Sequence, residues 1–357
     1  MLKYIKDQVG NYDVSSFINE LADASKHLGI LEAKIDSYQF DGILIPMLQK
    51  KEAISSMYIE GTQTTITDVL KNEISPQPTD EKIQLEVRNH VKTLIFGAEH
   101  LRSGKFTHTF MKQIHEYMMT GIITTGLEKT LGKYKLKDNQ IKSSTGTVVY
   151  TPPAATETKR YMDELISFMN NSDDGLNPLI KAAMIHSQFE SIHPFSDGNG
   201  RIGRVLISLY LYKAKVINFP FFYLSEAINL DKVVYYRMLT DSRTNSLDEW
   251  IKYFLHKVSI QTVKHIGYID ALNRLYTKIK NSVKECIKSP KFDEIIECLF
   301  THPVLNADIL EDQLSVSRGQ AVRYLNVLEE KQILLCDDRK RGKTYFFSEL
   351  IELAGGT

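Results

Sequence analysis

Cysteine, glycine, proline and net charge are all scarce in this chain of 357 residues, and each shortage excludes a class of protein. The three cysteines, Cys286, Cys298 and Cys336, form no Cys-x-x-Cys pair, which argues against a disulfide framework or a zinc site and for a reducing compartment. Only 19 glycines and 10 prolines interrupt the chain, so we expect a mainly α-helical protein. Because 44 basic residues balance 44 acidic ones, a protein that coats a polyanion through a bulk positive field is excluded.

Long apolar runs are also missing from the sequence. No stretch of about 18 apolar residues is present, so we expect no contact with a membrane. The first seven residues contain no apolar signal core, and we therefore expect a cytoplasmic protein. Hydrophobic residues still make up 43% of the chain, which is enough to bury the cores of two or three domains.

Helical patterns dominate the N-terminal part of the chain. One helix is expected to open at Ser15 or Ser16, either of which could cap it. A second helix is expected from about Pro46 to Glu60, with Gly61 as its natural stop. The segment Ser75-Pro76-Gln77-Pro78-Thr79 predicts a break between helices.

A short β-prone segment separates two helices that we predict within residues 81–170. Residues 141–150, Ile-Lys-Ser-Ser-Thr-Gly-Thr-Val-Val-Tyr, place two β-prone runs around a turn and predict a hairpin. Residues 177–216 follow as two helices with a glycine-rich hinge between them. A long amphipathic helix is then expected after Trp250 and up to about Val283.

The C-terminal residues change character and predict a separate small fold. We expect helices over Phe292–Phe300 and Asn306–Leu314 and from Ser317, then β-prone runs over Ile333–Cys336 and Thr344–Phe347. Ser317 could cap the third helix, with Gln320 in the capping-box position. Three helices followed by a hairpin are typical of a winged helix-turn-helix domain.

The most informative stretch is His193-Pro194-Phe195-Ser196-Asp197-Gly198-Asn199-Gly200-Arg201-Ile202-Gly203-Arg204. Pro194 disfavours α geometry at His193, so the preceding helix should end there and leave the imidazole facing a cleft. The three residues from Gly198 to Gly200 tolerate positive φ, and such a turn can aim successive backbone N–H groups at one anion.

The charges in this stretch indicate a phosphate site. A helix is expected to follow Gly200, and Arg201 and Arg204 in its first turn oppose the helix dipole unless an anion binds there. Asp197 is a hard oxygen ligand that suits Mg²⁺ held largely by phosphate and water, and His193 could accept a proton from a hydroxyl. The plain structural alternative is a glycine-rich turn between two helices that carries surface arginines.

The same residues resemble a known family. They match the Fic motif, His-x-Phe-x-(Asp/Glu)-Gly-Asn-Gly-Arg-x-x-Arg, at every fixed position, and residues 40–260 as a whole are similar to Fic domains. The resemblance implies a helical bundle with a small β-hairpin flap. It also implies that AMP moves from ATP, with Mg²⁺, to Ser, Thr or Tyr hydroxyls of target proteins and of the enzyme itself. A target would dock on the flap by strand addition, and relatives often form homodimers.

The resemblance assigns roles residue by residue: general base to His193, Mg²⁺ ligand to Asp197, anion hole to Gly198, Asn199 and Gly200, the α- and β-phosphates to Arg201 and the γ-phosphate to Arg204. Gly200 also favours transfer of AMP, since relatives that transfer phosphate carry a bulkier residue there. Tyr235 and Tyr236 resemble a pair of tyrosines that flank the adenine, although core aromatics would give the same pattern. Phe195 would be a buried anchor, and Lys135 stands where many relatives have arginine.

An inhibitory element is also implied. Ser56-Met57-Tyr58-Ile59-Glu60-Gly61 fits the family pattern (Ser/Thr)-x-x-x-Glu-(Gly/Asn). The helix dipole opposes a carboxylate in the last helical turn, so Glu60 needs a cation, and Arg204 is the candidate. A Glu60–Arg204 pair would occupy the arginine meant for the γ-phosphate. An exposed glutamate without a function is the alternative.

Other functions remain open at this stage. His186, Glu190 and His193 share a helix face, but the two histidines lie ~10 Å apart along its axis and cannot hold one zinc ion. His186 and Glu190 are therefore expected to satisfy buried polar groups. A DNA-binding regulator that uses the Fic domain as a nucleotide sensor is one alternative function, and a deAMPylase in which Glu60 orients a water is another.

DNA binding would rest on the C-terminal residues. Residues 288–343 hold nine basic and ten acidic residues, which is not the clear positive excess of most DNA-binding domains. Arg318, Gln320 and Arg323 nevertheless begin the candidate recognition helix, and residues 339–343 would form a basic wing. A module for protein interaction or dimerisation is the alternative.

We therefore predict four parts: an N-terminal helical region (1–85) with the inhibitory helix at about 46–61, a Fic catalytic domain (86–260) with its flap at 139–151 and its motif at 193–204, a linker helix (261–287) and a winged helix domain (288–357).

Overall fold

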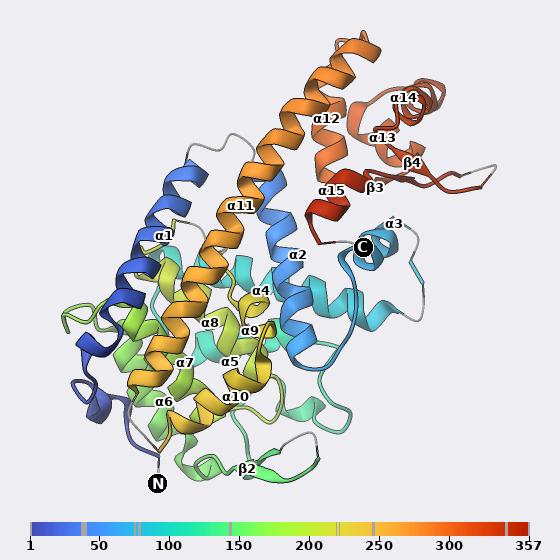
Figure 1. Cartoon of the computed structure of the whole chain (residues 1–357). Coiled ribbons are helices and arrows are strands. Elements are labelled where there is room, and N and C mark those ends of the chain that lie inside the picture. The colour runs from blue at the N-terminus through green and yellow to red at the C-terminus, as the bar shows by residue number, and fades with distance from the viewer. Residues whose placement is uncertain are drawn as a thin grey trace. The chain divides into compact units, whose positions relative to one another are not determined.

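A computed structural model describes residues 2–36, 41–74, 76–77, 80–142, 145–218, 220, 222–244, 247–339 and 342–355 (Figure 1). Several predicted positions lie outside these residues: Ser75, Pro78 and Thr79 of the predicted break, Ser143 and Ser144 of the hairpin turn, and Lys340 and Arg341 of the basic wing. The chain divides into two compact units. The first contains Met1–Asp36, Glu52–Thr62 and Leu85–Val263, and the second contains Ser37–Lys51, Gln63–Gln84 and Lys264–Thr357.

Helices supply most of the structure, as predicted. Up to the end of the long helix they are α1 (Ile18–Asp36), α2 (Asp41–Ile59), α3 (Ile66–Ile74), α4 (Glu81–Ser103), α5 (His108–Met119), α6 (Ala155–Asn170), α7 (Pro178–Ile192), α8 (Asn199–Lys213), α9 (Ser225–Asn229), α10 (Lys232–Asp241) and α11 (Asp248–Cys286). Between α5 and α6, β1 (Ile141–Lys142) and β2 (Val148–Tyr150) pair antiparallel, so the hairpin prediction is confirmed. The prediction of two helices within 81–170 is wrong, because α4, α5 and α6 all lie there.

Helix α7 lies in the core of the first unit and packs against α8 and α6 (Figure 1). Every residue from Leu179 to Ile192 is buried, which is the behaviour of a helix surrounded by others. Its start is well defined, because Asn177 accepts a hydrogen bond from the N–H of Leu179 and Pro178 occupies the first helical position. The motif 193–204 therefore joins two helices that the core holds in place.

Two predicted helix starts are wrong. Asp13, and not Ser15 or Ser16, caps the 3₁₀ turn that precedes α1. Both serine hydroxyls donate to Asp13, at 2.7 Å in each case, and the Asp13 side chain accepts from the Ser15 N–H. Helix α2 begins before Pro46, which lies inside it. Its end agrees with the prediction, since Gly61 takes a φ of 98° directly after the helix.

The second unit contains the C-terminal fold. Its elements are α12 (Phe292–Thr301), β3 (Val304–Leu305), α13 (Ala307–Leu314), α14 (Arg318–Glu330), β4 (Leu335–Cys336), β5 (Tyr345–Phe346) and α15 (Ser348–Leu353). The three strands form one antiparallel sheet in the order β3-β5-β4. Ser317 caps α14 as predicted, whereas the side chain of Gln320 donates to the Tyr324 hydroxyl at 2.6 Å and does not complete a capping box.

Two features of this unit were not predicted. β3 is only two residues long, which is too short to show the alternation of a strand in the sequence. Helix α15 follows shortly after β5, and it has no side-chain cap from which its start could be predicted. Among the described residues, no helix is both long and apolar enough to cross a bilayer.

Candidate functional site

His193 terminates α7 in an unusual backbone conformation. Its φ of 48° and ψ of 61° are left-handed, and its N–H still donates to the Phe189 carbonyl at 3.0 Å. This confirms the predicted helix end before Pro194. A left-handed residue other than glycine costs about 1 kcal/mol or more, so neighbouring contacts must hold it. The imidazole keeps 23% of its side-chain surface exposed, and the ring is therefore reachable from solvent.

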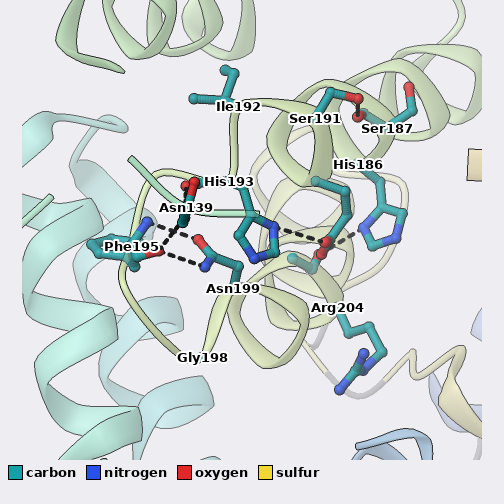
Figure 2. Close-up of polar contacts among 12 residues, drawn as sticks. Asn139, His186, Ser187, Ser191, Ile192, His193, Phe195, Gly198, Asn199 and Arg204 are labelled. Atoms are coloured by element: carbon teal, nitrogen blue, oxygen red, sulfur yellow. Dashed lines mark hydrogen bonds and ion pairs between the residues drawn. The ribbon is translucent and has the colours of Figure 1, made fainter. Parts of the chain in front are cut away.

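Two asparagines hold the loop after His193. The Asn199 side chain accepts from the Phe195 N–H and donates to the Phe195 carbonyl, both at 2.8 Å. Asn139 donates to the carbonyls of His193, at 3.2 Å, and Phe195, at 3.1 Å. Figure 2 shows both side chains directed at the backbone of Phe195. Asn199, predicted as part of an anion hole, thus uses its side chain to shape the loop.

Lys135, for which the sequence predicted no role, also supports the backbone next to His193. Its side chain is buried, and its ammonium donates to the Ile192 carbonyl at 3.2 Å and to Asn139 at 2.8 Å. A cation is favourable at this position, because the last carbonyls of α7 carry partial negative charge. Burial lowers the pKa of Lys135 to about 8, against a smaller opposing effect of Asp138.

Phe195 is fully buried, as predicted. Its ring stacks on His115 with centroids 4.0 Å apart. The Nδ1 atom of His115 accepts from the Gly132 N–H at 3.1 Å, so its Nε2–H donates to the Asp197 carbonyl at 3.1 Å. Burial lowers the pKa of His115 to about 4, which keeps this ring neutral. Phe195, by stacking on His115, therefore also helps to orient the backbone of Asp197.

The Asp197 carboxylate faces the N-terminus of α8. One oxygen accepts from the Thr124 N–H at 3.0 Å and the Thr124 hydroxyl at 2.6 Å, and the other accepts from the Gly198 N–H at 2.6 Å. Burial alone would raise the pKa of Asp197, but the Thr124 hydrogen bonds, the Arg201 charge and the Gly198 hydrogen bond together hold it below its ordinary value. The side chain is thus an ionised, 22% exposed oxygen donor.

The first turn of α8 begins two residues earlier than predicted, at Asn199. Only Gly198 of the glycine-rich turn has positive φ, at 78°, because Asn199 and Gly200 already belong to the helix. The Ile202 N–H donates to the Gly198 carbonyl, whereas the three preceding N–H groups have no acceptor within the helix. These free donors and the positive end of the dipole form a site for an anion.

Arg201 lies beside this helix start. Its guanidinium is 3.4 Å from Asp197 and 3.7 Å from Glu86, and 13% of the side chain is exposed. Its Nε–H is buried and has no hydrogen-bond partner among the residues that the structure describes. A buried donor that lacks an acceptor is costly, so a phosphate oxygen that accepts from it would be favoured.

Arg204 forms the predicted pair with Glu60. Its Nη2 donates to Glu60 Oε1 at 2.7 Å and to the Ser56 carbonyl at 3.1 Å, and its Nε donates to the Ser56 hydroxyl at 2.9 Å. The Arg204 side chain is 2% exposed and that of Glu60 37%. Burial would raise the pKa of Glu60, but the charge and hydrogen bond of Arg204 hold it below its ordinary value.

Gly200 allows this pair to form close to the helix. A Cβ atom at position 200 would lie 2.6 Å from Glu60 Oε1 and 3.0 Å from Arg204 Nη1. The missing side chain therefore leaves space for the carboxylate at the start of α8. On the same face of α2, Glu52 is buried and its carboxylate binds the N–H and hydroxyl of Ser225.

The residues before His193 are only partly as predicted. His186 satisfies buried polar groups, with Nδ1 3.0 Å from the Gly203 carbonyl and Nε2 2.9 Å from the Tyr235 hydroxyl. Glu190 does not, because its Oε1 is buried without a partner and its Oε2 lies 4.0 Å from His193 Nδ1.

The two tyrosines have different surroundings. Tyr235 is buried beside Trp250, with ring centroids 6.2 Å apart, and its hydroxyl is held by His186. Tyr236 is 47% exposed, and its hydroxyl lies 3.4 Å from the Ile59 carbonyl. Only Tyr236 presents a ring to solvent, so the core explanation that the sequence left open applies to Tyr235.

Comparisons with known proteins identify the family. Residues 18–99 match a model of the Fic/DOC family N-terminal region, and residues 105–211 match the Fic/DOC family model. A probable protein adenylyltransferase of Aquifex aeolicus is 27% identical over 177 residues, which are 49% of this chain and 51% of that protein. The chain thus spans about half the length of that relative.

Solved structures share the fold. A Fic family protein from Desulfovibrio desulfuricans covers 94% of this chain, and is itself covered to 97%, with a TM-score of 0.60 and 19% identity. A signaling protein with a Fic domain from Bacteroides thetaiotaomicron gives a TM-score of 0.55 over 68% of this chain and 95% of its own, at 21% identity. At such identities the likeness concerns the fold alone.

Proposed function

Because this chain belongs to the Fic/DOC family, we propose that it is a protein adenylyltransferase that moves AMP from ATP to hydroxyl groups of proteins. The observation that carries the proposal is the junction of α7 and α8. It holds a reachable imidazole at His193, an ionised carboxylate at Asp197 and an unpartnered guanidinium donor at Arg201. The name of the Aquifex relative supports the same activity.

The reaction follows from these groups. The free N–H groups at the start of α8 and the Arg201 guanidinium bind the phosphates of ATP. His193 accepts the proton of a Ser, Thr or Tyr hydroxyl, and the oxygen attacks the α-phosphorus. The bond from the α-phosphorus to the bridging oxygen breaks, and pyrophosphate leaves. Negative charge that grows on the phosphate oxygens meets donors that are already oriented, which lowers the barrier.

Asp197 fits a magnesium ion. Its carboxylate is ionised and partly exposed, and hard oxygen donors of this kind hold Mg²⁺ beside nucleotide phosphates. When bound, the ion would neutralise part of the phosphate charge. Thr124 and Gly198 orient the carboxylate through their hydrogen bonds, and Arg201 contributes a second positive charge next to it.

Glu60 is proposed to inhibit the enzyme by holding Arg204. While the carboxylate occupies this guanidinium, the γ-phosphate of ATP has no partner there, and ATP binds in an unproductive position. A hydrogen bond to a charged group is worth about 1.5–3 kcal/mol, and the partial exposure of Glu60 favours the lower figure. Loss of the pair should therefore raise activity by about tenfold or more.

The test uses ATP labelled on the α-phosphate and the full chain. Label should attach to protein strongly with Glu60→Gly, weakly with wild type and not with His193→Ala. Tyr58→Gly is the matched control, because Tyr58 is 47% exposed in the same last turn of α2 and the side-chain partners that bind Arg204 are Ser56 and Glu60. Equal labelling by Glu60→Gly and Tyr58→Gly would contradict the inhibitory role. No label with any variant that binds ATP would contradict self-modification, and loss of AMP from a labelled target would favour a deAMPylase.

The flap is proposed to bind the target protein. Val148 and Val149 of β2 are 43% and 48% exposed, and a hairpin of two strands has edges that a third strand can join. Substitution of both valines by aspartate should reduce labelling of a target. The affinity for ATP, measured by ATP titration, should be unchanged. A target labelled equally well by the variant would exclude docking at this edge.

We also propose that α12, α13, α14 and the β3-β5-β4 sheet form a winged helix module with a role in protein interaction or dimerisation. The DNA-binding alternative is disfavoured by ion pairs at three of the described basic residues on which it would rest. Arg318 pairs with Asp308, Arg339 with Asp337 and Lys343 with Glu329. A salt-dependent mobility shift of labelled duplex DNA by the full chain would reverse this preference.

A further inference from the structure

Glu190 and His193 lie one helical turn apart, and the carboxylate of Glu190 faces the imidazole of His193. The Oε2 atom of Glu190 is 4.0 Å from Nδ1 of His193. Within the part of the chain that the structure describes, Nδ1 of His193 is buried without a hydrogen-bond partner, and so is Oε1, the other oxygen of the Glu190 carboxylate. The Glu190 side chain is only 8% exposed. Orphaned polar atoms in a core are costly, so their retention calls for an explanation.

The glycine at position 203 makes room for this carboxylate. A Cβ atom there would collide with Glu190 Oε1 and would lie 3.3 Å from the Cε1 atom of His186. Position 203 is one of the unspecified residues of the motif, so the motif itself gives no reason for a glycine. The absence of a side chain on α8 thus leaves Glu190 lodged between the two helices.

We propose that Glu190 is the positioning residue of the catalytic histidine, an inference that rests on the proposed adenylyl transfer. Its carboxylate accepts the Nδ1–H of His193 once the ring rotates slightly to close the gap. This fixes the tautomer whose Nε2 lone pair is free to accept a proton. When the O–H bond of the target breaks, the proton moves to Nε2, and Glu190 stays ionised and pairs with the imidazolium. AMP is transferred to the oxygen as pyrophosphate leaves.

The charges around the pair favour this arrangement at neutral pH and above. Burial and the Lys135 charge lower the pKa of His193 to about 4, with smaller opposing effects of the Glu190 backbone and Glu60. Burial raises the pKa of Glu190 to about 7, while Arg204 and Arg243 oppose this rise and Glu60 adds to it. Tyr235 also faces Glu190, and burial keeps its own pKa well above the ordinary value, so it remains neutral. The working carboxylate is therefore present from about pH 7 upward.

Variants of Glu190 in the Glu60→Gly chain test the proposal. Glu190→Gln should lower kcat for labelling about 100-fold, because an amide does not stabilise the imidazolium, while the Kd for ATP stays within about twofold. Glu190→Asp should recover part of the rate. Glu164→Gln is the matched control, since this carboxylate lies on α6 and pairs with Lys6 away from the site. The Glu190 carbonyl remains in every variant, so the comparison isolates the carboxylate.

The pH profile separates positioning from packing. The parent and Glu164→Gln should lose rate as pH falls through the pKa of Glu190, whereas Glu190→Gln should show no such limb. In this parent the limb should lie below pH 7, because the Glu60 charge that adds to the rise is absent. A Glu190→Gln variant within twofold of its parent in kcat, with the same limb, would overturn the proposal. A parent that binds ATP yet labels no protein would refute the transferase function, and with it the role of the pair.

A measurement on the unmodified chain covers the case in which the variants fail to fold. Nitrogen-15 spectra of the imidazole, assigned with His193→Ala, report which ring nitrogen carries the proton. At pH 8 the proposal requires the proton of His193 on Nδ1. A proton on Nε2 would overturn it.

Discussion

Asn199→Ala should loosen the loop that presents His193, and the cost can be worked out from the contacts. The Asn199 side chain is 3% exposed and makes two hydrogen bonds to Phe195. Among the described residues, the Phe195 N–H has no other acceptor, and a buried donor left unpaired costs about 1–3 kcal/mol. The Phe195 carbonyl keeps its bond from Asn139, so that loss is about 1 kcal/mol. We expect a total of about 3 kcal/mol.

The assay is thermal unfolding followed by calorimetry. For a unit of this size, about 3 kcal/mol corresponds to a fall in Tm of roughly 6–12 °C. Asn139→Ala is the comparison, with an expected fall of similar size. Its bonds to the carbonyls of His193 and Phe195 are longer, at 3.2 and 3.1 Å, but the substitution also removes an acceptor of the buried Lys135 ammonium, at 2.8 Å. Transfer of labelled AMP at a temperature where the variant is folded should also decrease, because His193 loses its fixed position.

The double variant Asn139→Ala/Asn199→Ala tests whether the two side chains share the Phe195 carbonyl. Asn139 and Asn199 both donate to the Phe195 carbonyl, so removal of both leaves this buried oxygen without either partner. The combined loss should exceed the sum of the single losses by about 1 kcal/mol. A fall in Tm below about 2 °C for Asn199→Ala, or strict additivity in the double variant, would show that the loop is held by other contacts.

Four further variants test protonation, binding and stability. Burial raises the pKa of Glu52 to about 7, so the folded protein binds a proton that the unfolded chain releases above pH 4.5, and stability falls as pH rises between these values. Glu52→Gln should therefore lose less unfolding free energy between pH 5 and pH 8 in urea titrations than wild type does. Lys135→Met removes a positive charge near His193, so the pKa of that imidazole should rise above its value of about 4, as an NMR titration would show. Tyr236→Ala should weaken ATP binding by roughly tenfold if the exposed ring stacks on the base. Tyr235→Phe should leave ATP affinity unchanged in the same calorimetric titration and cost about 1 kcal/mol of stability through the lost bond to His186.

Local patterns predicted what depends on neighbours in the chain. The end of α7 before Pro194, the hairpin and the cap of α14 at Ser317 all follow from residues a few positions apart. The Glu60–Arg204 pair was also predicted, from the resemblance to the family's inhibitory pattern together with charge, because a carboxylate at a helix C-terminus and an arginine at a helix N-terminus each lack a counter-charge.

Contacts between distant segments were not predictable in the same way. Lys135 and Asn139 support the motif from more than fifty positions away, and no pattern in the sequence pairs them with its backbone. Thr124 holds Asp197 through a loop whose path depends on the packing of α5. The start of α2 was placed too late because Pro46 is typical of a first turn, although the helix accommodates it further in.

The burial of Arg204 has a consequence for how the proposed inhibition would respond to its surroundings. A buried guanidinium is not left bare, since an unpaired charge in the core costs several kcal/mol, so a phosphate enters only as the Glu60 carboxylate departs. The Glu60 carboxylate and a phosphate of ATP therefore compete for the same guanidinium, and the carboxylate is tethered to the site by the chain. The tethered carboxylate keeps its local concentration on dilution, whereas ATP does not. We therefore expect the specific activity, the rate per molecule of this protein, to follow the ATP concentration along a simple hyperbola. The specific activity should not depend on the protein concentration.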